Sequence, residues 1–224
     1  LNYEAEFIRI RTPLDRGIVQ VNGNAGALPR DRYLGDPSRN NLHVNGDTHQ
    51  FTLDHDLGQG WRTRVGASYR ETDLYGEAVD LTGTLQADGR TLTRRDSWRS
   101  LPARDTSVQA EVEGKLQTGG LRHTVLAGVE SWRLFMGQDI RYSTLASQPF
   151  AIDIYNPTYG QAPGNLTPGF DTRDRQRATG LFVQDQIDLS ERWKLLAGVR
   201  FDRYHQDYEN RLNRAVQTQS HSAA

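Results

Sequence analysis

The 224-residue chain contains no cysteine. Disulfide bonds, thiolate metal sites and cysteine nucleophiles are therefore excluded. The sequence also lacks the spacings of familiar catalytic centres: it has no Gly-x-Ser-x-Gly, no phosphate-binding glycine loop and no His-Glu-x-x-His. We accordingly expect no catalytic residues, no resident metal site and no covalently bound cofactor, and a protein that is not an enzyme.

Neither sign of charge dominates, because 27 lysine and arginine residues stand against 28 aspartate and glutamate residues. A protein that binds nucleic acid normally carries a positive excess, so we predict no nucleic-acid partner. Long apolar runs are missing as well. No stretch approaches the ~20 apolar residues of a membrane-spanning helix, and the mean hydropathy is −0.72. Transmembrane strands remain allowed, since they need apolar residues only at alternate positions.

What the sequence does contain is a regular alternation of apolar and polar side chains. The clearest case is Ala178–Tyr208, two predicted strands joined by the polar connector Leu189–Arg192. Side chains in a strand point alternately to opposite faces. One face of the second strand is therefore apolar throughout: Trp193, Leu195, Ala197, Val199 and Phe201. One residue breaks the pattern, because Asp185 falls on the apolar face of the first strand.

Connections of two very different lengths separate the predicted strands. The strands are Asn2–Arg11, Asp47–Asp56, Trp61–Arg70, Ser107–Leu116, Leu121–Trp132, Thr179–Asp188 and Trp193–Tyr208. Long loops are predicted at 12–46, 71–104 and 137–173, and tight turns at 57–60, 117–120 and 189–192. From Glu209 the chain turns polar, and no further strand is predicted. Since ordinary connections have a median of ~4–6 residues, a sheet with one long-loop end and one short-turn end is indicated.

Unequal ends and one apolar face are typical of a transmembrane antiparallel β-barrel, with short periplasmic turns and long extracellular loops. We expect six apolar residues to face outer-membrane lipid: Trp61, Val65, Val112, Val129, Leu195 and Val199. The lumen would receive Arg62, Arg64, Glu111, Glu113 and Arg200. A soluble β-sandwich also alternates, but its turns come every ~8–12 residues, which loops of this length do not fit.

Several stretches resemble the TonB-dependent siderophore receptors of Gram-negative outer membranes, most closely the hydroxamate- and pyoverdine-type branch. The stretches are Thr12–Gly17, Val65–Arg70, Leu85–Arg90, Ile152–Pro157, Thr179–Gln186 and Leu196–Asp202. The resemblance implies a 22-stranded barrel around an N-terminal plug domain. It also implies uptake of a ferric siderophore, powered through the TonB–ExbB–ExbD complex. Residues 1–224 would then be the middle part of the barrel, without the plug domain and the C-terminal strands. The start at Leu1 rather than methionine fits such a fragment.

Receptors of this family hold their ligands with extracellular aromatic residues and hydrogen-bond donors. An aromatic side chain supplies a large contact area with few rotatable bonds. The resemblance therefore points to five aromatic residues near strand ends or in long loops as candidate ligand contacts: Tyr75, Trp98, Tyr142, Tyr155 and Tyr159. Two other interpretations stay open. One is another outer-membrane barrel, such as a porin-like channel or an adhesin, and the other is a soluble β-rich enzyme.

Overall fold

The structure is a computed structural model that describes residues 1–143, 150–162 and 164–223. All of its elements are strands, and no helix in these ranges is long and apolar enough to cross a membrane. The strands are β1 (Asn2–Thr12), β2 (Asn41–Gly58), β3 (Trp61–Leu85), β4 (Thr91–Thr118), β5 (Leu121–Ser143), β6 (Ile152–Asp153), β7 (Leu166–Asp188), β8 (Lys194–Asn210) and β9 (Ala215–Ala223).

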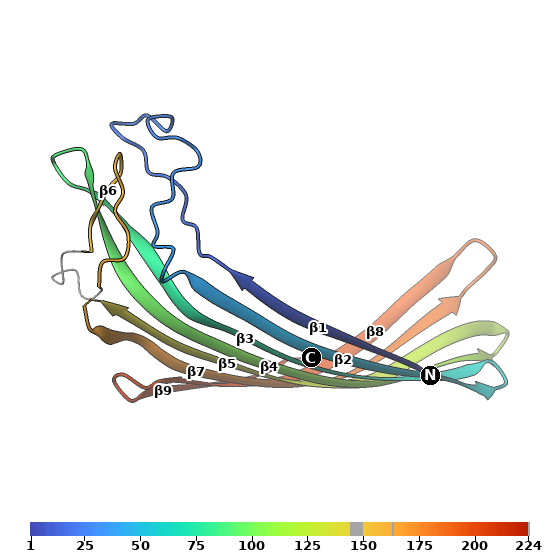
Figure 1. Cartoon of the computed structure of the whole chain (residues 1–224). Helices are drawn as coiled ribbons and strands as arrows, with labels where there is room; N and C mark the ends of the chain where they lie inside the picture. Colours follow the sequence, from blue (N-terminus) through green and yellow to red (C-terminus); the bar gives the residue numbers. More distant parts are fainter. Residues whose placement is uncertain (144–149, 163, 224) are drawn as a thin grey trace.

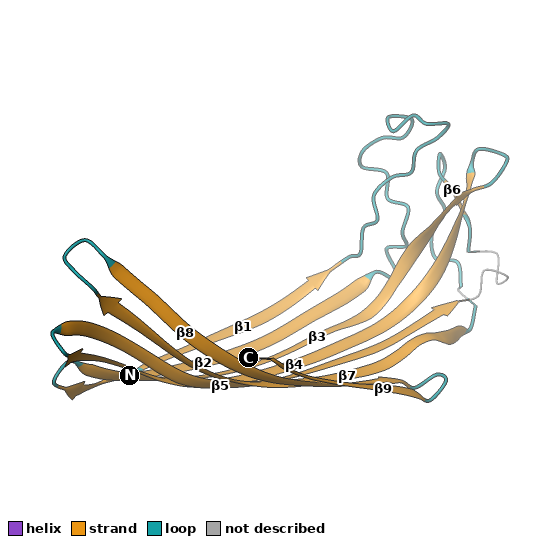
Figure 2. Ribbon diagram, turned by 180° about the vertical axis from the view of Figure 1, so that it is seen from behind, coloured by secondary structure: helices purple, strands orange, loops and turns teal. Residues whose placement is uncertain are grey.

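Eight of these strands form one antiparallel sheet in the order β1-β2-β3-β4-β5-β7-β8-β9, and the short β6 pairs with β4. The sheet curves into an open trough, with a concave and a convex face (Figures 1 and 2). Apart from β1 and β9 at the two edges, each of these eight strands is hydrogen-bonded to the strand before it and to the strand after it in this order. This meander is the pattern expected of an up-and-down barrel wall, and the sheet is not closed within the described residues.

The two ends of the trough differ as predicted. At one end the strands are joined by tight connections, among them the turn at Gly119 and Gly120. Both glycines have positive φ, 57° and 89°, and a two-residue type I′ hairpin requires positive φ at both positions. At the other end lie the long segment 13–40 and the segment that carries β6 (Figure 1). We call these the short-turn end and the loop end.

The predicted loops 71–104 and 137–173 are wrong in extent, because most of their residues continue the strands. β3 and β4 run on to a tip at 86–90, and β5 and β7 leave only residues 144–165 between them, part of which lies outside the described residues. The backbone ladder continues where the alternation of side chains stops. Hydrogen bonding between strands needs no apolar face, whereas alternation is needed only where one face meets an apolar medium.

A further strand was missed at the polar end of the sequence. β9 pairs with β8 over nine residue pairs, from Asn210–Ala215 to Asp202–Ala223, after a short turn at 211–214. The polar sequence after Glu209 therefore forms a hairpin at the loop end. The connections at that end are consequently not all long.

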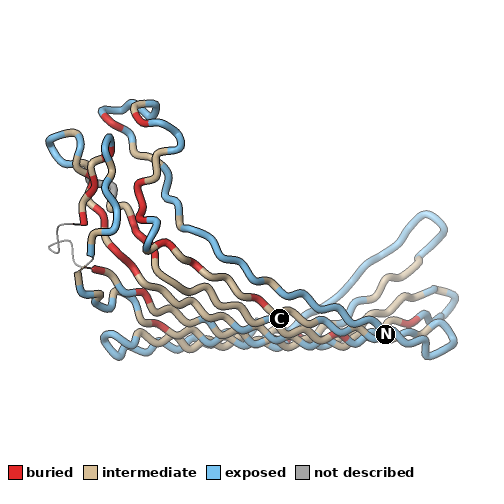
Figure 3. Tube along the Cα trace, viewed as in Figure 1, coloured by how far each residue is buried: buried red, intermediate tan, exposed pale blue. Residues whose placement is uncertain are grey.

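Burial is concentrated at the loop end (Figure 3). There the segment 13–40, the tip of the β3–β4 hairpin and β6 pack around one small apolar cluster: Val21, Leu28, Leu34, Leu92, Ile152 and Ile154. We call this assembly the cap. The apolar side chains of the sheet are by contrast exposed, for example Leu181 at 54% and Val199 at 59%. An apolar surface of this kind needs an apolar medium, because its contact with water is unfavourable.

Candidate ligand-binding site

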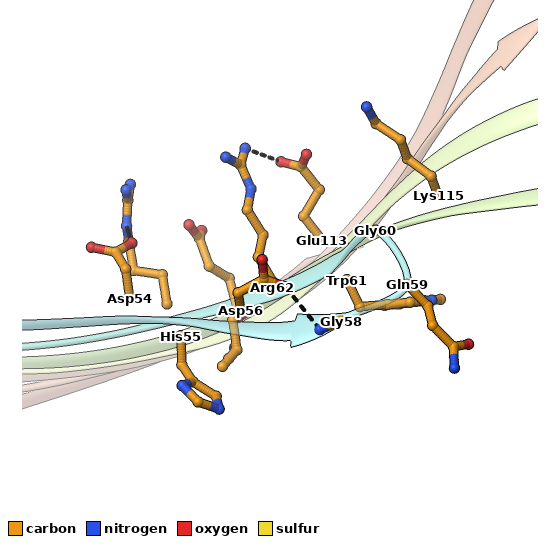
Figure 4. A pocket seen from close by; sticks show the side chains of 13 residues that line it. Asp54, His55, Asp56, Gly58, Gln59, Gly60, Trp61, Arg62, Glu113 and Lys115 are labelled. Atoms are coloured by element: carbon orange, nitrogen blue, oxygen red, sulfur yellow. Dashed lines mark hydrogen bonds and ion pairs between the residues drawn. The ribbon is translucent and has the colours of Figure 1, made fainter.

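The concave face of the sheet carries charges that pair with one another across the strands. Arg62 donates a hydrogen bond to Glu113 over 2.7 Å, and Arg64 donates one to Asp54 over 2.6 Å. Figure 4 shows Arg62, Glu113 and Asp54 rising from the same side of the ribbon, while His55 points the opposite way. Farther along the sheet, Arg200 contacts both Glu130 and Asp202. Four of the five residues predicted to face the lumen thus form ion pairs on a polar surface: Arg62, Arg64, Glu113 and Arg200. The fifth, Glu111, stands opposite Arg64 in the register.

The convex face carries the residues predicted to face lipid. One row of the sheet register runs across five strands through Val65, Ala110, Val129, Leu181 and Phe201. The next row toward the short-turn end includes Thr63, Val112, Ala127, Val183 and Val199. Adjacent rows of apolar side chains form the continuous band that a transmembrane barrel presents to hydrocarbon. The alternation in the sequence therefore identified this face correctly.

The exceptional Asp185 has a partner on this face. Its Oδ2 lies 2.7 Å from Nδ1 of His123, which follows the Gly119–Gly120 turn by three residues. In the register, Asp185 stands opposite Val125, and His123 opposite Ile187. The pair is therefore close to the short-turn end, where polar side chains cost far less than at the centre of a bilayer.

The cap is held together by the buried guanidinium of Arg94 on β4. The residue is 1% exposed and donates to the backbone oxygens of Phe150 (2.9 Å), Leu34 (3.1 Å) and Gly35 (2.6 Å). A fourth hydrogen bond reaches Oε1 of Gln161 over 3.1 Å. Burial lowers the pKa of Arg94. One side chain of the sheet thus joins the segment 13–40 to the segment 150–162.

Two buried carboxylates of the cap have opposite pKa behaviour. Burial alone would raise the pKa of Asp36, but hydrogen bonds from the Ser38 hydroxyl and from the Gly160 and Ser38 amides bring it below its usual value. Asp96, which is 1% exposed, has no such set of donors. Burial raises its pKa to about 6, although Arg39 at 3.7 Å opposes the shift. Asp36 is thus a fixed anion of the cap, whereas Asp96 gains a proton only as the pH falls through about 6.

Tyr159 and Tyr155, two of the candidate ligand contacts, lie in the cap and have partners within it. The hydroxyl of Tyr159 donates to the backbone oxygen of Tyr33 over 2.7 Å, and the two rings lie 6.4 Å apart. Arg90 lies over the ring of Tyr155 at 5.4 Å. Both tyrosines remain 41% exposed. Each therefore packs within the cap on one side and presents a surface on the other.

Tyr75, Trp98 and Tyr142, the other three candidates, lie on the strands below the cap. Tyr75 stacks on His43 with 5.1 Å between ring centroids, and Arg141 lies over the ring of Trp98 at 5.3 Å. Tyr75 pairs with Ser100, two positions from Trp98, so these two aromatics are diagonal neighbours on one face. Tyr142 contacts Arg95, at 3.7 Å from the ring centroid, and Phe170 at 6.4 Å. The five candidates therefore do not form one cluster.

The alternation and the aromatic residues in the sequence did not identify three polar residues that organise the cap: Arg94, Asp36 and Tyr33. Burial and the nearby carboxylates of Asp15 and Asp36 raise the pKa of Tyr33 to about 12, so it stays protonated at physiological pH. No local spacing marks these residues, because the partners that join them to other segments are 56 to 126 positions away in the sequence.

Comparison with known proteins places this architecture in a family. The family model described as "TonB dependent receptor-like, beta-barrel" matches residues 1–223. The chain belongs to the TonB-dependent receptor β-barrel family. Relatives of this chain are named as receptors and transporters, and the family is one of Gram-negative outer-membrane proteins. The fold and the membrane location inferred from the sequence are thereby confirmed.

Two relatives and one solved structure illustrate the similarity. The metal-pseudopaline receptor CntO of Pseudomonas aeruginosa (strain UCBPP-PA14) is 40% identical over 215 residues, 94% of this chain and 30% of the relative. The ferrioxamine B receptor of Salmonella typhimurium (strain SL1344) is 25% identical over 195 residues, 85% of this chain and 26% of the relative. The closed form of the ferric-catecholate import receptor Fiu from Escherichia coli K12 superimposes with a TM-score of 0.79 at 16% identity, covering 99% of this chain and 37% of that one.

The chain thus spans about 30% of the length of these curated relatives. The solved structure, at 16% identity, supports the fold alone.

Proposed function

We propose that this chain is part of the barrel wall of an outer-membrane receptor that takes up a metal-chelating ligand by TonB-dependent transport. The match of the family model over residues 1–223 carries the proposal. The rest of the barrel, a plug domain and a TonB box would lie elsewhere in the protein, and TonB–ExbB–ExbD would supply the energy. Residues 1–224 would form one part of a single barrel domain. The protein would bind and move its ligand rather than catalyse a reaction.

The ligand that we propose is a ferric siderophore, as carried by the ferrioxamine relative. One observation favours a second candidate. The relative with 40% identity is named a metal-pseudopaline receptor, whereas the ferrioxamine B receptor shares only 25%. A metal–pseudopaline type of chelate is therefore a specific alternative within the same transport function. A porin-like channel, an adhesin or a soluble enzyme finds less support, because none would account for the family match.

The proposed orientation puts the loop end outside the cell and the short-turn end in the periplasm. The cap would then stand over the entrance of the barrel. Of the predicted contacts, Tyr155 and Tyr159 have an exposed ring surface in the cap, and Tyr142 lies on the strand below it with Arg95. A cationic and aromatic pair of this kind suits the oxygen-rich, anionic surface of many metal chelates. Tyr75 and Trp98 share the convex face with Val65 and Ala110 in the register, so they stay proposals only for a ligand that contacts the outer side of the upper strands.

Uptake of labelled chelates by cells that carry the full-length receptor tests the proposal. Deleting the gene should abolish uptake of one ⁵⁵Fe-siderophore or of one metal–pseudopaline complex, and removing TonB should have the same effect. A Tyr142→Ala variant should bind that ligand roughly tenfold more weakly, which corresponds to on the order of 1–2 kcal/mol for one aromatic contact. Uptake of every chelate unchanged by gene deletion would contradict the proposal.

A further inference from the structure

A serine, a histidine and an aspartate form one hydrogen-bonded chain across β8 and β9. The ring of His205 lies between the other two: its Nδ1 is 2.7 Å from Oγ of Ser220, and its Nε2 is 3.0 Å from Oδ2 of Asp207. Thr218 donates to the second carboxylate oxygen, Oδ1 of Asp207, over 2.8 Å. In the register, His205 stands opposite Ser220 and Asp207 opposite Thr218. The four side chains therefore occupy two adjacent rungs on one face of the hairpin.

These hydrogen bonds determine which nitrogen of a neutral His205 carries the proton. An ionised carboxylate can only accept, so the nitrogen that faces Asp207 is the N–H donor. The nitrogen that faces Ser220 is then an acceptor, and the serine hydroxyl donates to it. A hydroxyl held against a histidine whose opposite nitrogen binds a carboxylate is the arrangement that activates serine as a nucleophile. Such a site is defined by its geometry and not by the order of its residues in the sequence.

A second histidine–aspartate pair on the convex face lacks the serine. Nδ1 of His123 is 2.7 Å from Oδ2 of Asp185, but Nε2 of His123 has no hydrogen-bond partner among the described residues. The complete chain of three groups is therefore a specific feature of the β8–β9 hairpin. The spacings in the sequence did not indicate it, because Ser220 lies on β9, which the alternation of side chains did not predict.

The hollow beside Ser220 contains positive charge. Ser220 and His205 line it together with three arginines, Arg133, Arg177 and Arg203. In the register, Arg133 stands opposite Arg177, which in turn stands opposite His205. Like charges directly opposite each other in an antiparallel sheet are destabilising, so negative charge that develops between the two guanidinium groups is stabilised. Donors of this kind beside a nucleophile suit the oxyanion that forms when serine attacks a carbonyl carbon.

The position of the hairpin indicates the class of substrate. Along β8, His205 lies four residues beyond Phe201, which belongs to the apolar band. At ~3.4 Å per residue, the distance between them is ~14 Å. An apolar chain that lies on the band, away from water, can therefore bring a polar group at its end up to the serine. A carboxylic ester with an apolar acyl chain fits both the band and the nucleophile.

We propose that Ser220, His205 and Asp207 hydrolyse a carboxylic ester that carries an apolar acyl chain. Oγ of Ser220 attacks the carbonyl carbon while its proton passes to Nδ1 of His205. The bond to the leaving oxygen breaks, and His205 returns the proton to the released alcohol. Water then attacks the acyl-serine with the same help from His205, so that the carboxylic acid leaves and Ser220 is restored. Asp207 and Thr218 are positioning residues, because they hold the ring without touching the ester.

This activity goes beyond the proposed function. The hairpin site lies on the convex face, outside the lumen through which a transported ligand would pass. Transport uses no step of the reaction, so each activity can be lost without the other.

The test uses the purified full-length receptor in detergent micelles, with p-nitrophenyl palmitate and p-nitrophenyl butyrate as probes. We expect the receptor to release p-nitrophenol from them. Faster turnover of the palmitate ester would identify a membrane lipid as the source of the ester, and faster turnover of the butyrate ester would identify a soluble one. A fluorophosphonate should label the receptor, and peptide mass spectrometry should place the label on Ser220. No release from either ester, or no label on Ser220, would overturn the proposal.

Two serine variants connect the hydrolysis to the nucleophile. Ser220→Ala removes only a hydroxyl, so the receptor should fold, and kcat should fall at least about 100-fold. Ser131→Ala is the matched control, because Ser131 lines the same hollow but its hydroxyl contacts the backbone oxygen of Ala178 and the hydroxyl of Thr179. Its kcat should change less than about twofold. Equal effects of the two substitutions would refute the assignment of Ser220.

Histidine and aspartate variants test the rest of the chain. His205→Gln should lower kcat as much as loss of the serine hydroxyl does, whereas His123→Gln, in the pair without a serine, should leave it unchanged. Asp207→Asn can donate to the ring and so place the proton on the wrong nitrogen. It should lower kcat about 100-fold with KM changed less than about twofold. An unchanged kcat in Asp207→Asn would show that the carboxylate has only a structural role and would contradict the mechanism.

Chelate uptake separates this inference from the proposed function. Cells that carry the Ser220→Ala receptor should take up the labelled chelate as fast as cells with the wild type. A wild-type receptor that takes up the chelate but hydrolyses neither ester would remove this inference alone. A receptor that hydrolyses the ester but takes up no chelate would remove the proposed function alone.

Discussion

Replacing Arg94 with methionine should release the cap from the sheet without unfolding the barrel wall. Methionine has a comparable length but no donor, so the backbone oxygens of Phe150, Leu34 and Gly35 would lose their shared partner. A buried acceptor left without a hydrogen bond costs ~1–3 kcal/mol. The variant also removes the unfavourable burial of a charge, which offsets part of this loss. We expect a net destabilisation of the cap by about 3 kcal/mol.

Amide hydrogen exchange of the full-length receptor is the appropriate assay, because it measures local opening. At 1.36 kcal/mol per factor of ten, a loss of about 3 kcal/mol speeds exchange in the cap roughly 100-fold. Useful probes are the amides of Gly160 and Ser38, both of which donate to Asp36. The exchange rates of amides in the central strands should be unchanged, because these amides belong to a separate and more stable part of the hydrogen-bonded sheet.

The matched control is Arg90→Met, at the tip of the same hairpin. Arg90 joins the hairpin tip to β6, through Asp153 over 2.8 Å, but its side chain is 54% exposed. Exposed ion pairs contribute little, so exchange in the cap should rise less than about fivefold. If Arg94→Met and Arg90→Met had the same effect, the argument that the buried guanidinium holds the cap together would be wrong.

The sequence alone predicted the membrane-facing part of the fold well, and the reason is physical. Hydrocarbon on one side and a polar lumen on the other force a period of two on each strand. Residues such as Val65, Val129 and Val199 could therefore be placed from their spacing. The prediction failed where that constraint ends. Beyond Arg70 both faces of β3 meet water or the cap, so the alternation stops although the ladder continues to Leu85.

The candidate site was less predictable, because it depends on contacts between distant segments. The aromatic residues were found by their type and their place near strand ends. Their partners were not: the contact of Tyr159 with Tyr33 spans 126 positions, and nothing near either residue encodes it. Arg94 is the extreme case, because its side chain is indistinguishable in the sequence from that of Arg95, yet only Arg94 is enclosed by three backbone oxygens.

Three further predictions concern the membrane band, the orientation and the cap. Val199→Arg should lower the free energy of unfolding of the receptor by up to ~2–4 kcal/mol if the site is near the midplane, which a refolding titration measures as a shift of the midpoint. Arg200→Lys on the opposite face should shift that midpoint far less. Equal shifts would contradict the assignment of faces. A protease added to intact cells should cut within residues 13–40 and spare the turn 57–60, and the reverse would invert the orientation. Asp96→Asn should stabilise the cap at neutral pH, because the carboxyl has a pKa of about 6 in the fold and a lower one when unfolded. Between about pH 4 and 6 the folded state therefore binds more protons than the unfolded state, and the free energy of unfolding falls as the pH rises through that window. The full cost of the buried Asp96 charge, on the order of 2–3 kcal/mol, is present above pH 6. Amide exchange in the cap should therefore slow in Asp96→Asn relative to the wild type at pH 7.5, and the two proteins should converge near pH 4 once intrinsic exchange rates are corrected. A stabilisation of equal size at both pH values would show that the buried charge is not its cause.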